Sequence, residues 1–386
     1  AMVSAKWIWT PTREFVERTN VFRFMRRLGF ESREEFLRFS AEQPERFYDE
    51  LCREIGVEWF EPCTQVLDTS RGVAWAQWFV GGKLNIAWNC LDRHARGSNA
   101  NRHAVVWEGE DGSIRKLTFA ELYAEASRLA HALESLCLRR GDRVALLMPM
   151  VPEVVVILYA CFKLGLTVVP IFAGFGPNAV ATRLEDSAAR VLFTADFLER
   201  RGNRLPLKEK ADQACQSAST LEKIVVLSYK GGEVPWAAHR DVWWHELVKG
   251  KPAEHDSLPL DSEDRALILY TSGTTGKPKG AVHTHAGALI QTAKEIFLGF
   301  DHQPDDLFFW LSDIGWMMGP WTIIGNHHFG GTVFLFDGAF DHPQADRLWA
   351  MIERHRITTL GISPTAIRLL MRKNNDLVRG HDLSSL

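Results

Sequence analysis

Apolar and polar residues alternate along most of this chain in blocks that predict strands and helices in turn. From Asn101 onward, short apolar runs predict strands at 104–108, 144–147, 167–172, 191–194 and 224–227. The segments between them have helical spacing, at 118–141, 153–164 and 177–189. Thr118 and Glu121 form a capping box at the start of the first helix, and Gly141 is expected to end it. This alternation predicts an α/β fold with a parallel sheet covered on both faces.

A second β/α set follows a segment that contains Pro252 and Pro259. That segment, residues 247–263, is predicted to be a linker. After it, apolar runs predict strands at 266–270, 307–311, 332–336 and 358–362, and helices at 285–298, 321–329, 344–356 and 364–373. The pattern predicts two doubly wound β/α subdomains: residues 101–142 together with 261–386, and residues 143–260.

The first hundred residues have a different character. Residues 1–100 are rich in Trp and Phe and carry short amphipathic helices at 33–39 and 44–55, so we expect a helical and irregular extension wrapped on the main body. The strongly apolar stretch 154–175 contains Lys163, Gly165 and Pro170 and divides into a helix and a strand. We interpret it as a buried βαβ segment and not as a membrane span.

Composition and charge narrow the class of protein. The 386 residues are 46% hydrophobic and 24% charged, which is typical of a soluble globular protein of two or three domains. A net charge of −3 gives no electrostatic basis for binding nucleic acid or an anionic membrane. The six cysteines include no C-x-x-C pair, which disfavours a zinc cluster and fits a reducing cytoplasm. The first residues have no apolar signal core, so the expected location is cytoplasmic.

The densest candidate chemistry follows the predicted strand 266–270. It is the run Thr271, Ser272, Gly273, Thr274, Thr275, Gly276, Lys277, Pro278, Lys279 and Gly280. Glycines let successive backbone N–H groups point inward, hydroxyls add donors and lysines add positive charge, so the run predicts a loop that binds phosphate. Lys277 and Lys279 alternate across a turn that Pro278 stiffens, so at most one of them is expected to reach a phosphate.

The spacing of this loop differs from that of the common phosphate loop. That pattern has four residues between its glycines and a Ser or Thr after the Lys. Here two residues separate Gly273 from Gly276, and Pro278 follows Lys277, which disfavours a kinase- or GTPase-type site. A polar surface loop without a ligand is the alternative.

Together with Tyr270, the run resembles the signature of the AMP-forming (adenylate-forming) synthetases, which include acyl-CoA synthetases, peptide-synthetase adenylation domains and luciferases. The resemblance implies that the loop clamps the pyrophosphate end of ATP and that His283 lies near the nucleotide. The segment from Trp78 to His94 resembles the Leu-Asn-x-x-x-Asn-x-Leu-Asp-Arg-His segment of the acetyl- and propionyl-CoA synthetase branch. We expect this segment to have a structural role, and it favours that branch.

A second candidate site is the run from Ser312 to Trp321, in which Trp316, Met317 and Met318 form an apolar group. Taken alone, such a group indicates core packing. The run is similar to the Asp-x-Gly-Trp segment of acetyl-CoA synthetase-like enzymes, where the Trp and the residues after it line the acyl pocket. Those enzymes typically have Val-Thr after the Trp, so Met317 and Met318 put acetate as the substrate in doubt.

Arginines cluster at Arg200, Arg201 and Arg204. In the acetyl-CoA synthetase branch an Arg-x-Gly-Arg at this position contacts the 3′-phosphate of CoA. Arg200 and Gly202 match that pattern, whereas Asn203 stands at the second Arg position. Guanidinium groups pair well with the oxygens of a phosphomonoester, so the cluster is predicted to bind CoA. A solvated basic loop is the alternative.

One motif points elsewhere. Gly174, Gly176 and Ala179 fit the G-x-G-x-x-A fingerprint of dinucleotide binding, with Asp196 about twenty residues later. Two observations disfavour a dehydrogenase. A strand is already predicted at Val144, so the motif does not follow the first strand of the sheet, and Pro177 lacks an N–H where pyrophosphate needs donors. The histidines show no convincing metal-ligand spacing, and no metal site is predicted.

The resemblance implies an acid–CoA ligase of the acetyl-CoA synthetase-like type, acting on a small carboxylic acid with ATP, CoA and Mg²⁺. The adenine- and ribose-binding segments and the C-terminal domain with the adenylation Lys are expected beyond Leu386. The chain is therefore expected to be an N-terminal fragment, inactive alone. A peptide-synthetase-type adenylation enzyme and a non-catalytic nucleotide-binding module are the alternatives.

Overall fold

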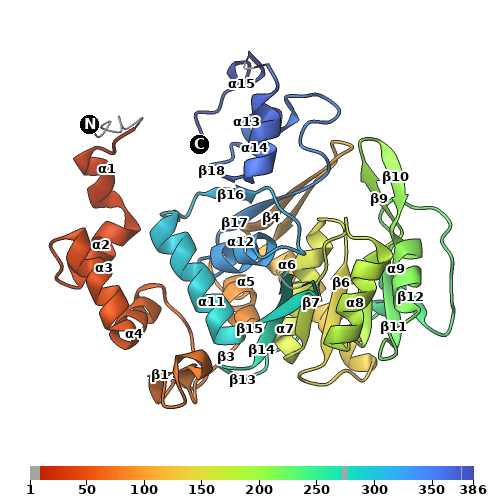
Figure 1. The fold of residues 1–386 in the computed structure, drawn as a ribbon, viewed down its shortest axis with the longest axis horizontal. Helices are drawn as coiled ribbons and strands as arrows, with labels where there is room; N and C mark the ends of the chain where they lie inside the picture. The colour runs from red at the N-terminus through yellow and green to blue at the C-terminus, as the bar shows by residue number, and fades with distance from the viewer. Residues whose placement is uncertain (1–8, 272–275, 375) are drawn as a thin grey trace.

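The computed structural model describes residues 9–271, 276–374 and 376–386. Two β-sheets with their helices form the body, and the four helices of the N-terminal extension lie together at one end of it (red, Figure 1). The β9–β10 hairpin, Phe197–Arg200 with Asn203–Pro206, lies at the opposite end in the same view.

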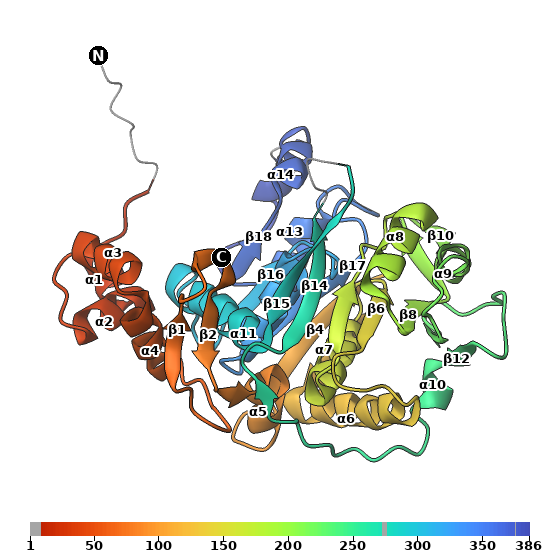
Figure 2. The same cartoon turned by 60° about the horizontal axis from the view of Figure 1, so that its bottom comes forward.

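The larger sheet has seven strands in the order β12-β11-β8-β6-β7-β14-β15. Neighbours run parallel except β14 and β15, which form an antiparallel hairpin at one edge and stand side by side in Figure 2. The strands are β6 (Arg143–Leu147), β7 (Thr167–Pro170), β8 (Val191–Ala195), β11 (Lys223–Leu227), β12 (Asp241–Trp243), β14 (Arg265–Thr271) and β15 (Lys279–Thr284).

The smaller sheet has five strands in the order β18-β16-β17-β4-β5, parallel except for the β4–β5 pair. Its strands are β4 (His103–Gly109), β5 (Ile114–Thr118), β16 (Leu307–Trp310), β17 (Thr332–Asp337) and β18 (Thr359–Gly361). Two strands of the smaller sheet, β4 and β5, precede the strands of the larger sheet in the sequence, and the other three follow them. The short strands β1 (Gln65–Asp68), β2 (Gln77–Val80), β3 (Lys83–Leu84) and β13 (Leu260–Asp261) pair outside both sheets.

Side chains of alternating strand positions enter different cores. In β6, Val144 and Leu146 belong to the largest apolar cluster, whereas Ala145 and Leu147 belong to a second cluster on the other face of the sheet. The largest cluster contains α6 (Phe119–Ser135), α7 (Pro152–Leu164), α11 (His285–Lys294) and α12 (Met318–His327) and also reaches one face of the smaller sheet. A layer of helices is thus shared by the two sheets.

The remaining helices cover the outer faces. The second cluster packs α8 (Pro177–Ser187) and α9 (Leu207–Cys215) on the larger sheet, and a third packs α13 (Arg347–His355) and α14 (Pro364–Met371) on the smaller one. Two further helices are short: α10 (Trp244–Leu247), whose Trp244 belongs to the largest cluster, and α15 (Asp376–Arg379), which has no buried residue. The fold is therefore α/β with both sheets doubly wound, as the alternation of elements predicts.

The N-terminal extension contains α1 (Arg13–Arg18), α2 (Asn20–Arg27), α3 (Arg33–Glu42) and α4 (Pro44–Glu54). Rings of Phe24, Phe36 and Phe47 pack edge to face or tilted at its centre. The amide of Asn20 donates to the carbonyl oxygens of Phe297 and His302 and so attaches the extension to the body. Strands β1, β2 and β3 follow α4 in the chain, and the short helix α5 (Arg93–Ala95) comes after them.

Local signals in the sequence have mixed outcomes. The capping box of Thr118 and Glu121 is present, and the apolar stretch 154–175 forms α7 and β7 of a buried βαβ unit. None of the helices in the described ranges is long and apolar enough to cross a membrane.

The prediction that Gly141 ends the first helix is wrong. Helix α6 ends at Ser135, and Cys137 has a left-handed φ of 60°. The Gly141 N–H instead donates to Gly165 O.

The strand that precedes the glycine-rich loop also differs from the expectation. The predicted division groups it with residues 101–142, but β14 pairs with β7 and so belongs to the sheet built from residues 143–243. Strand β15, which the apolar pattern does not predict, continues the same sheet. An apolar run predicts a buried strand without identifying the strand beside it, which explains the difference.

Candidate functional site

The two sheets meet through the loops at the carboxyl ends of their strands. Trp107, near the end of β4, donates its ring N–H to the carbonyl of Met150, which follows β6, over 2.8 Å. Gly315, which follows β16, lies so close to the backbone of Ile171 and Phe172, which follow β7, that a Cβ at Gly315 would overlap it. In open α/β sheets, ligands bind in the crevice outside the carboxyl ends of the strands. This junction is therefore the candidate site.

The glycine-rich loop joins β14 to β15 at this edge. Thr271 pairs with Lys279 across the hairpin, Gly276 has a left-handed φ of 96°, and the side chains of Lys277 and Lys279 are exposed. The predicted phosphate contacts Ser272, Gly273, Thr274 and Thr275 lie outside the described residues. Leu267 in β14 is in register with Val168 in the parallel strand β7. The loop after β14 therefore begins at the same carboxyl end of the sheet as Phe172, which follows β7.

His283 lies on β15, paired with Leu267, and is half-buried. Burial lowers the pKa of its imidazole, which favours the neutral ring at neutral pH. Side chains on a strand alternate between faces, so His283 and Lys279 share one face of β15. Two of the residues that the sequence connects with the nucleotide, Lys279 and His283, therefore point to the same side of the hairpin.

The apolar group of Trp316, Met317 and Met318 is divided between two environments. Trp316 is 41% exposed, and its ring lies 5.2 Å from that of Phe172 and 5.8 Å from that of Phe175. Met317 and Met318 instead stand at the start of α12 and pack against the cluster of Ile296, Phe308 and Trp321. Trp316 thus belongs to the junction between the sheets, while the two methionines connect the junction to the helical layer.

Two aspartates at strand ends form the polar part of the junction. Asp337 ends β17, is 1% exposed in its side chain, and accepts hydrogen bonds from the Tyr229 hydroxyl at 2.8 Å and the Met150 N–H at 3.4 Å. Asp313 follows β16 and accepts a hydrogen bond from the Gly315 N–H. Burial raises the pKa of Asp313 to about 7. Neither aspartate is among the predicted site residues, although the Asp313 position in Asp-x-Gly-Trp was a signal.

The arginine cluster forms a β-hairpin that the apolar pattern does not predict. Arg201 and Gly202 have φ of 51° and 73°, as a two-residue turn of type I′ requires. Each arginine has a protein partner: Arg200 pairs with Asp337 at 2.8 Å, Arg201 pairs with Asp341 at 2.7 Å, and Arg204 donates to the carbonyls of Lys230 and Gly231. The hairpin therefore also connects the two sheets.

The structure leaves Asp196, the acidic residue of the dinucleotide-binding fingerprint, unable to bind a ribose. The carboxylate of Asp196 is fully buried and accepts four backbone hydrogen bonds, from Phe197, Tyr229, Lys230 and Gly231. A carboxylate held in this way orders the loops after β8 and β11 and has no free position for a ribose hydroxyl. The geometry disfavours a dehydrogenase.

The sequence model of the AMP-binding enzyme family matches residues 91–386, which include the junction, the glycine-rich hairpin and the arginine hairpin. The chain belongs to this family. A second model, of the acetyl-coenzyme A synthetase N-terminus, matches residues 33–90, so the chain belongs to the acetyl-CoA synthetase-like branch of the family.

Individual relatives agree with the family assignment. The chain is 38% identical over 384 residues to an acetyl-coenzyme A synthetase of Methanothrix soehngenii, a match that covers 98% of this chain and 57% of the relative. It is 42% identical over 342 residues to one of Streptomyces coelicolor, covering 88% of this chain and 52% of the relative. The chain spans about half the length of the curated relatives it matches.

A solved structure has the same fold. The acetoacetyl-CoA synthetase from Streptomyces lividans superposes with a TM-score of 0.90 at 27% identity, over 98% of this chain and 58% of that chain. The polar residues of the Trp78–His94 segment, which the branch shares, bond inside the protein: Asp92 pairs with buried Lys163 at 2.6 Å, and Asn85 donates to Phe162 O. These contacts support its structural role.

Proposed function

We propose that this chain is part of an acid–CoA ligase that activates a carboxylic acid as an acyl-adenylate. The single observation that carries the proposal is the position of the glycine-rich hairpin, which extends from the sheet edge where the carboxyl ends of both sheets converge. The family assignment adds ATP and CoA as the substrates that such an enzyme uses.

The reaction has two steps. An oxygen of the carboxylate attacks the α-phosphorus of ATP, and the bond from that phosphorus to pyrophosphate breaks. The CoA sulfur then attacks the acyl carbon, the bond to AMP breaks, and the thiol proton is released. The protein's task is to balance pyrophosphate charge, align the acid with the α-phosphate and exclude water. Mg²⁺ is expected as part of the ATP complex, and we assign no residue of this chain to it.

We assign roles to the site residues as follows. Thr271, Gly276 and Lys279 would hold phosphates together with the loop residues between them, and His283 would lie beside the nucleotide on the same strand face as Lys279. Arg201 and Arg204 would meet the CoA phosphate. Arg200, whose guanidinium is already paired with buried Asp337, would orient their hairpin.

The acid would lie between Trp316 and the two methionines. Met side chains are flexible and adapt to the shape of an apolar ligand, so Met317 and Met318 would decide which acid tail is accepted. The relatives are named for small acids, acetate and acetoacetate. We therefore propose a small carboxylic acid, with a preference that differs from acetate because of this Met pair.

The test uses the protein encoded by the complete reading frame of the gene, incubated with ATP, CoA and one acid at a time. The acids are acetate, propionate, acetoacetate and larger acids, and chromatography measures the acyl-CoA formed. A thioester that depends on ATP and on one class of acid supports the proposal. The 386-residue chain alone is expected to bind ATP without turnover, because it spans about half the length of its relatives. A folded complete protein that forms no thioester with any acid, yet binds ATP, would favour a non-catalytic nucleotide-binding module.

A further inference from the structure

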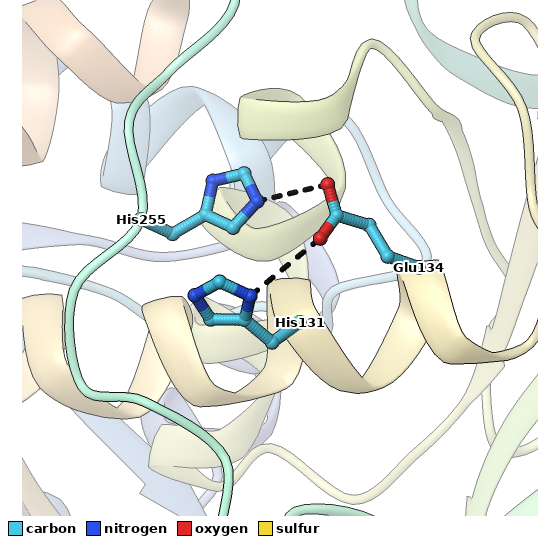
Figure 3. Close-up of side chains that lie close together, drawn as sticks. All are labelled: His131, Glu134 and His255. Atoms are coloured by element: carbon cyan, nitrogen blue, oxygen red, sulfur yellow. Dashed lines mark hydrogen bonds and ion pairs between the residues drawn. The ribbon is translucent and has the colours of Figure 1, made fainter.

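Three metal-ligating side chains meet outside the candidate site. His131 and Glu134 lie one turn apart in α6, and His255 lies in the segment that joins α10 to β13 (Figure 3). His255 Nε2 is 3.0 Å from Glu134 Oε1, and His131 Nδ1 is 3.6 Å from Glu134 Oε2. The two rings pack edge to face, with their centroids 4.6 Å apart.

Backbone carbonyls determine which nitrogen of each ring is free. A carbonyl oxygen only accepts hydrogen bonds, so the ring nitrogen beside it carries a proton. His131 Nε2 lies 2.8 Å from Glu254 O, and His255 Nδ1 lies 2.7 Å from Asp256 O. With these N–H groups engaged, each neutral ring directs its remaining nitrogen, a lone-pair donor, toward the carboxylate of Glu134 (Figure 3).

Two imidazole lone pairs beside a carboxylate repel one another unless a positive charge lies between them. A proton on either ring is one solution, and a metal ion is the other. Two histidines and one carboxylate are a known ligand set for Zn²⁺ that leaves one position for water. The carbonyl that orients each ring on its far side is the arrangement found around metal-bound histidines.

The ligands are also held in place before any metal binds. The carbonyl of His255 accepts hydrogen bonds from the buried ammonium of Lys163 at 2.9 Å and from the Tyr123 hydroxyl at 3.3 Å. Lys163 in turn pairs with fully buried Asp92. The side chain of Glu134 is 48% exposed, so the position between the three groups is open to solvent. Zn–N bonds of about 2.0–2.1 Å separate tetrahedral ligands by roughly 3.3 Å, so a small side-chain movement suffices.

From this geometry we propose that His131, Glu134 and His255 form a binding site for Zn²⁺ or a chemically similar divalent transition metal. The ion would fasten the segment from Lys251 to Pro259, which joins α10 to β13, onto the C-terminal end of α6. Sequence spacing does not reveal the site, because the third ligand follows the second by more than a hundred residues.

The experiment measures zinc per chain after equilibrium dialysis, in the wild type and in His131→Ala, His255→Ala and Glu134→Gln. We expect about one bound zinc in the wild type, a loss of at least tenfold in affinity in each variant, and a rise of a few degrees in Tm with zinc for the wild type alone. Glu134→Gln keeps the side-chain shape, so it tests the site even where an alanine variant folds poorly.

His245→Ala is the matched control, because His245 also lies beside a glutamate, Glu246 at 3.8 Å, but among the residues that the structure describes it has no third ligand. It should bind zinc as the wild type does. Cobalt substitution should give a spectrum without a thiolate charge-transfer band, which excludes the cysteines as ligands. A wild type that binds no zinc, or variants that bind it as tightly as the wild type, would overturn the proposal.

Discussion

The guanidinium of Arg200 lies 2.8 Å from the carboxylate of Asp337 and so connects the β9–β10 hairpin to the end of β17 in the other sheet. The same hairpin is fixed at its turn, where the Gly202 N–H donates to Glu110 Oε1 at 2.9 Å. Both contacts hold the hairpin that carries the candidate CoA-binding arginines against the smaller sheet. The relative position of the two halves of the site therefore depends on these polar contacts.

Replacing Asp337 should weaken this junction. Asp337→Asn keeps the side-chain volume but removes the charge that faces Arg200, and it disturbs the bond from the Tyr229 hydroxyl. We expect the free energy of unfolding in urea to fall by about 1.5–3 kcal/mol, the usual contribution of hydrogen bonds to a charged group. Glu222→Gln, at the more exposed Arg190–Glu222 pair, should change it by less than about 1 kcal/mol. Equal effects of the two substitutions would contradict this interpretation.

The close approach of Gly315 to Phe172 predicts a steric effect. In Gly315→Ala the new methyl group would overlap the backbone of Ile171 and Phe172, so the two sheets must separate locally. We expect a loss of about 1–3 kcal/mol or more, because backbone cannot move aside as a side chain can. Gly299→Ala is the control, since a Cβ there meets no atom of the described residues within 4 Å. Thermal unfolding measures both, and an unchanged Tm for Gly315→Ala would show that the sheets are not in this contact.

Asp313 should make stability depend on pH. Its folded-state pKa of about 7 is above its ordinary value of 3.8, because burial disfavours the charged form and nearby Asp337 adds to the effect, while Arg200 opposes it. Between these two values the unfolded chain releases the proton that the folded chain retains. The contribution of Asp313 to stability therefore falls as the pH rises from about 4 to about 7.

Asp313→Asn removes this titration and keeps an oxygen for the Gly315 N–H. The stability of the variant relative to the wild type should increase across that pH interval and stay constant above it. Urea unfolding of both proteins at a series of pH values measures the difference. A difference that does not vary with pH would mean that Asp313 is ionised in the folded protein throughout.

The two lysines of the glycine-rich loop should contribute unequally to activity. Lys279 shares a strand face with His283, whereas Lys277 lies in the bend before β15. We expect Lys279→Ala to slow acyl-CoA formation by the complete protein about 10- to 100-fold, the effect of losing a charge-assisted bond of about 1.5–3 kcal/mol. Lys277→Ala should have a smaller effect. The reverse order would assign the phosphate contact to Lys277.

Much of the fold can be predicted from the sequence because buried elements carry strong periodic signals. Strands such as β6 and β8, and helices such as α7, consist almost entirely of buried apolar residues. Strand β15 was missed because it lies at a sheet edge, and four of its six residues are exposed. Strand β10 is fully exposed and gives no apolar alternation at all.

The candidate site also contains features that the sequence predicts and features that it does not. Contiguous motifs, such as the glycine-rich loop and the run around Trp316, can be found in the sequence alone. The pairing of Arg200 with Asp337 joins residues 137 positions apart, and the contact of His255 with Glu134 joins residues 121 positions apart. Such contacts depend on which strands become neighbours, and an apolar run does not specify its neighbour.

The central claim is that the protein activates a carboxylic acid as an acyl-adenylate. The most direct test is acid-dependent exchange of labelled pyrophosphate into ATP by the protein encoded by the complete reading frame, since this exchange reports the adenylation step without CoA. The account predicts exchange that requires one class of small carboxylic acid and falls sharply in Lys279→Ala. A folded protein that binds ATP but catalyses no exchange with any acid would contradict it.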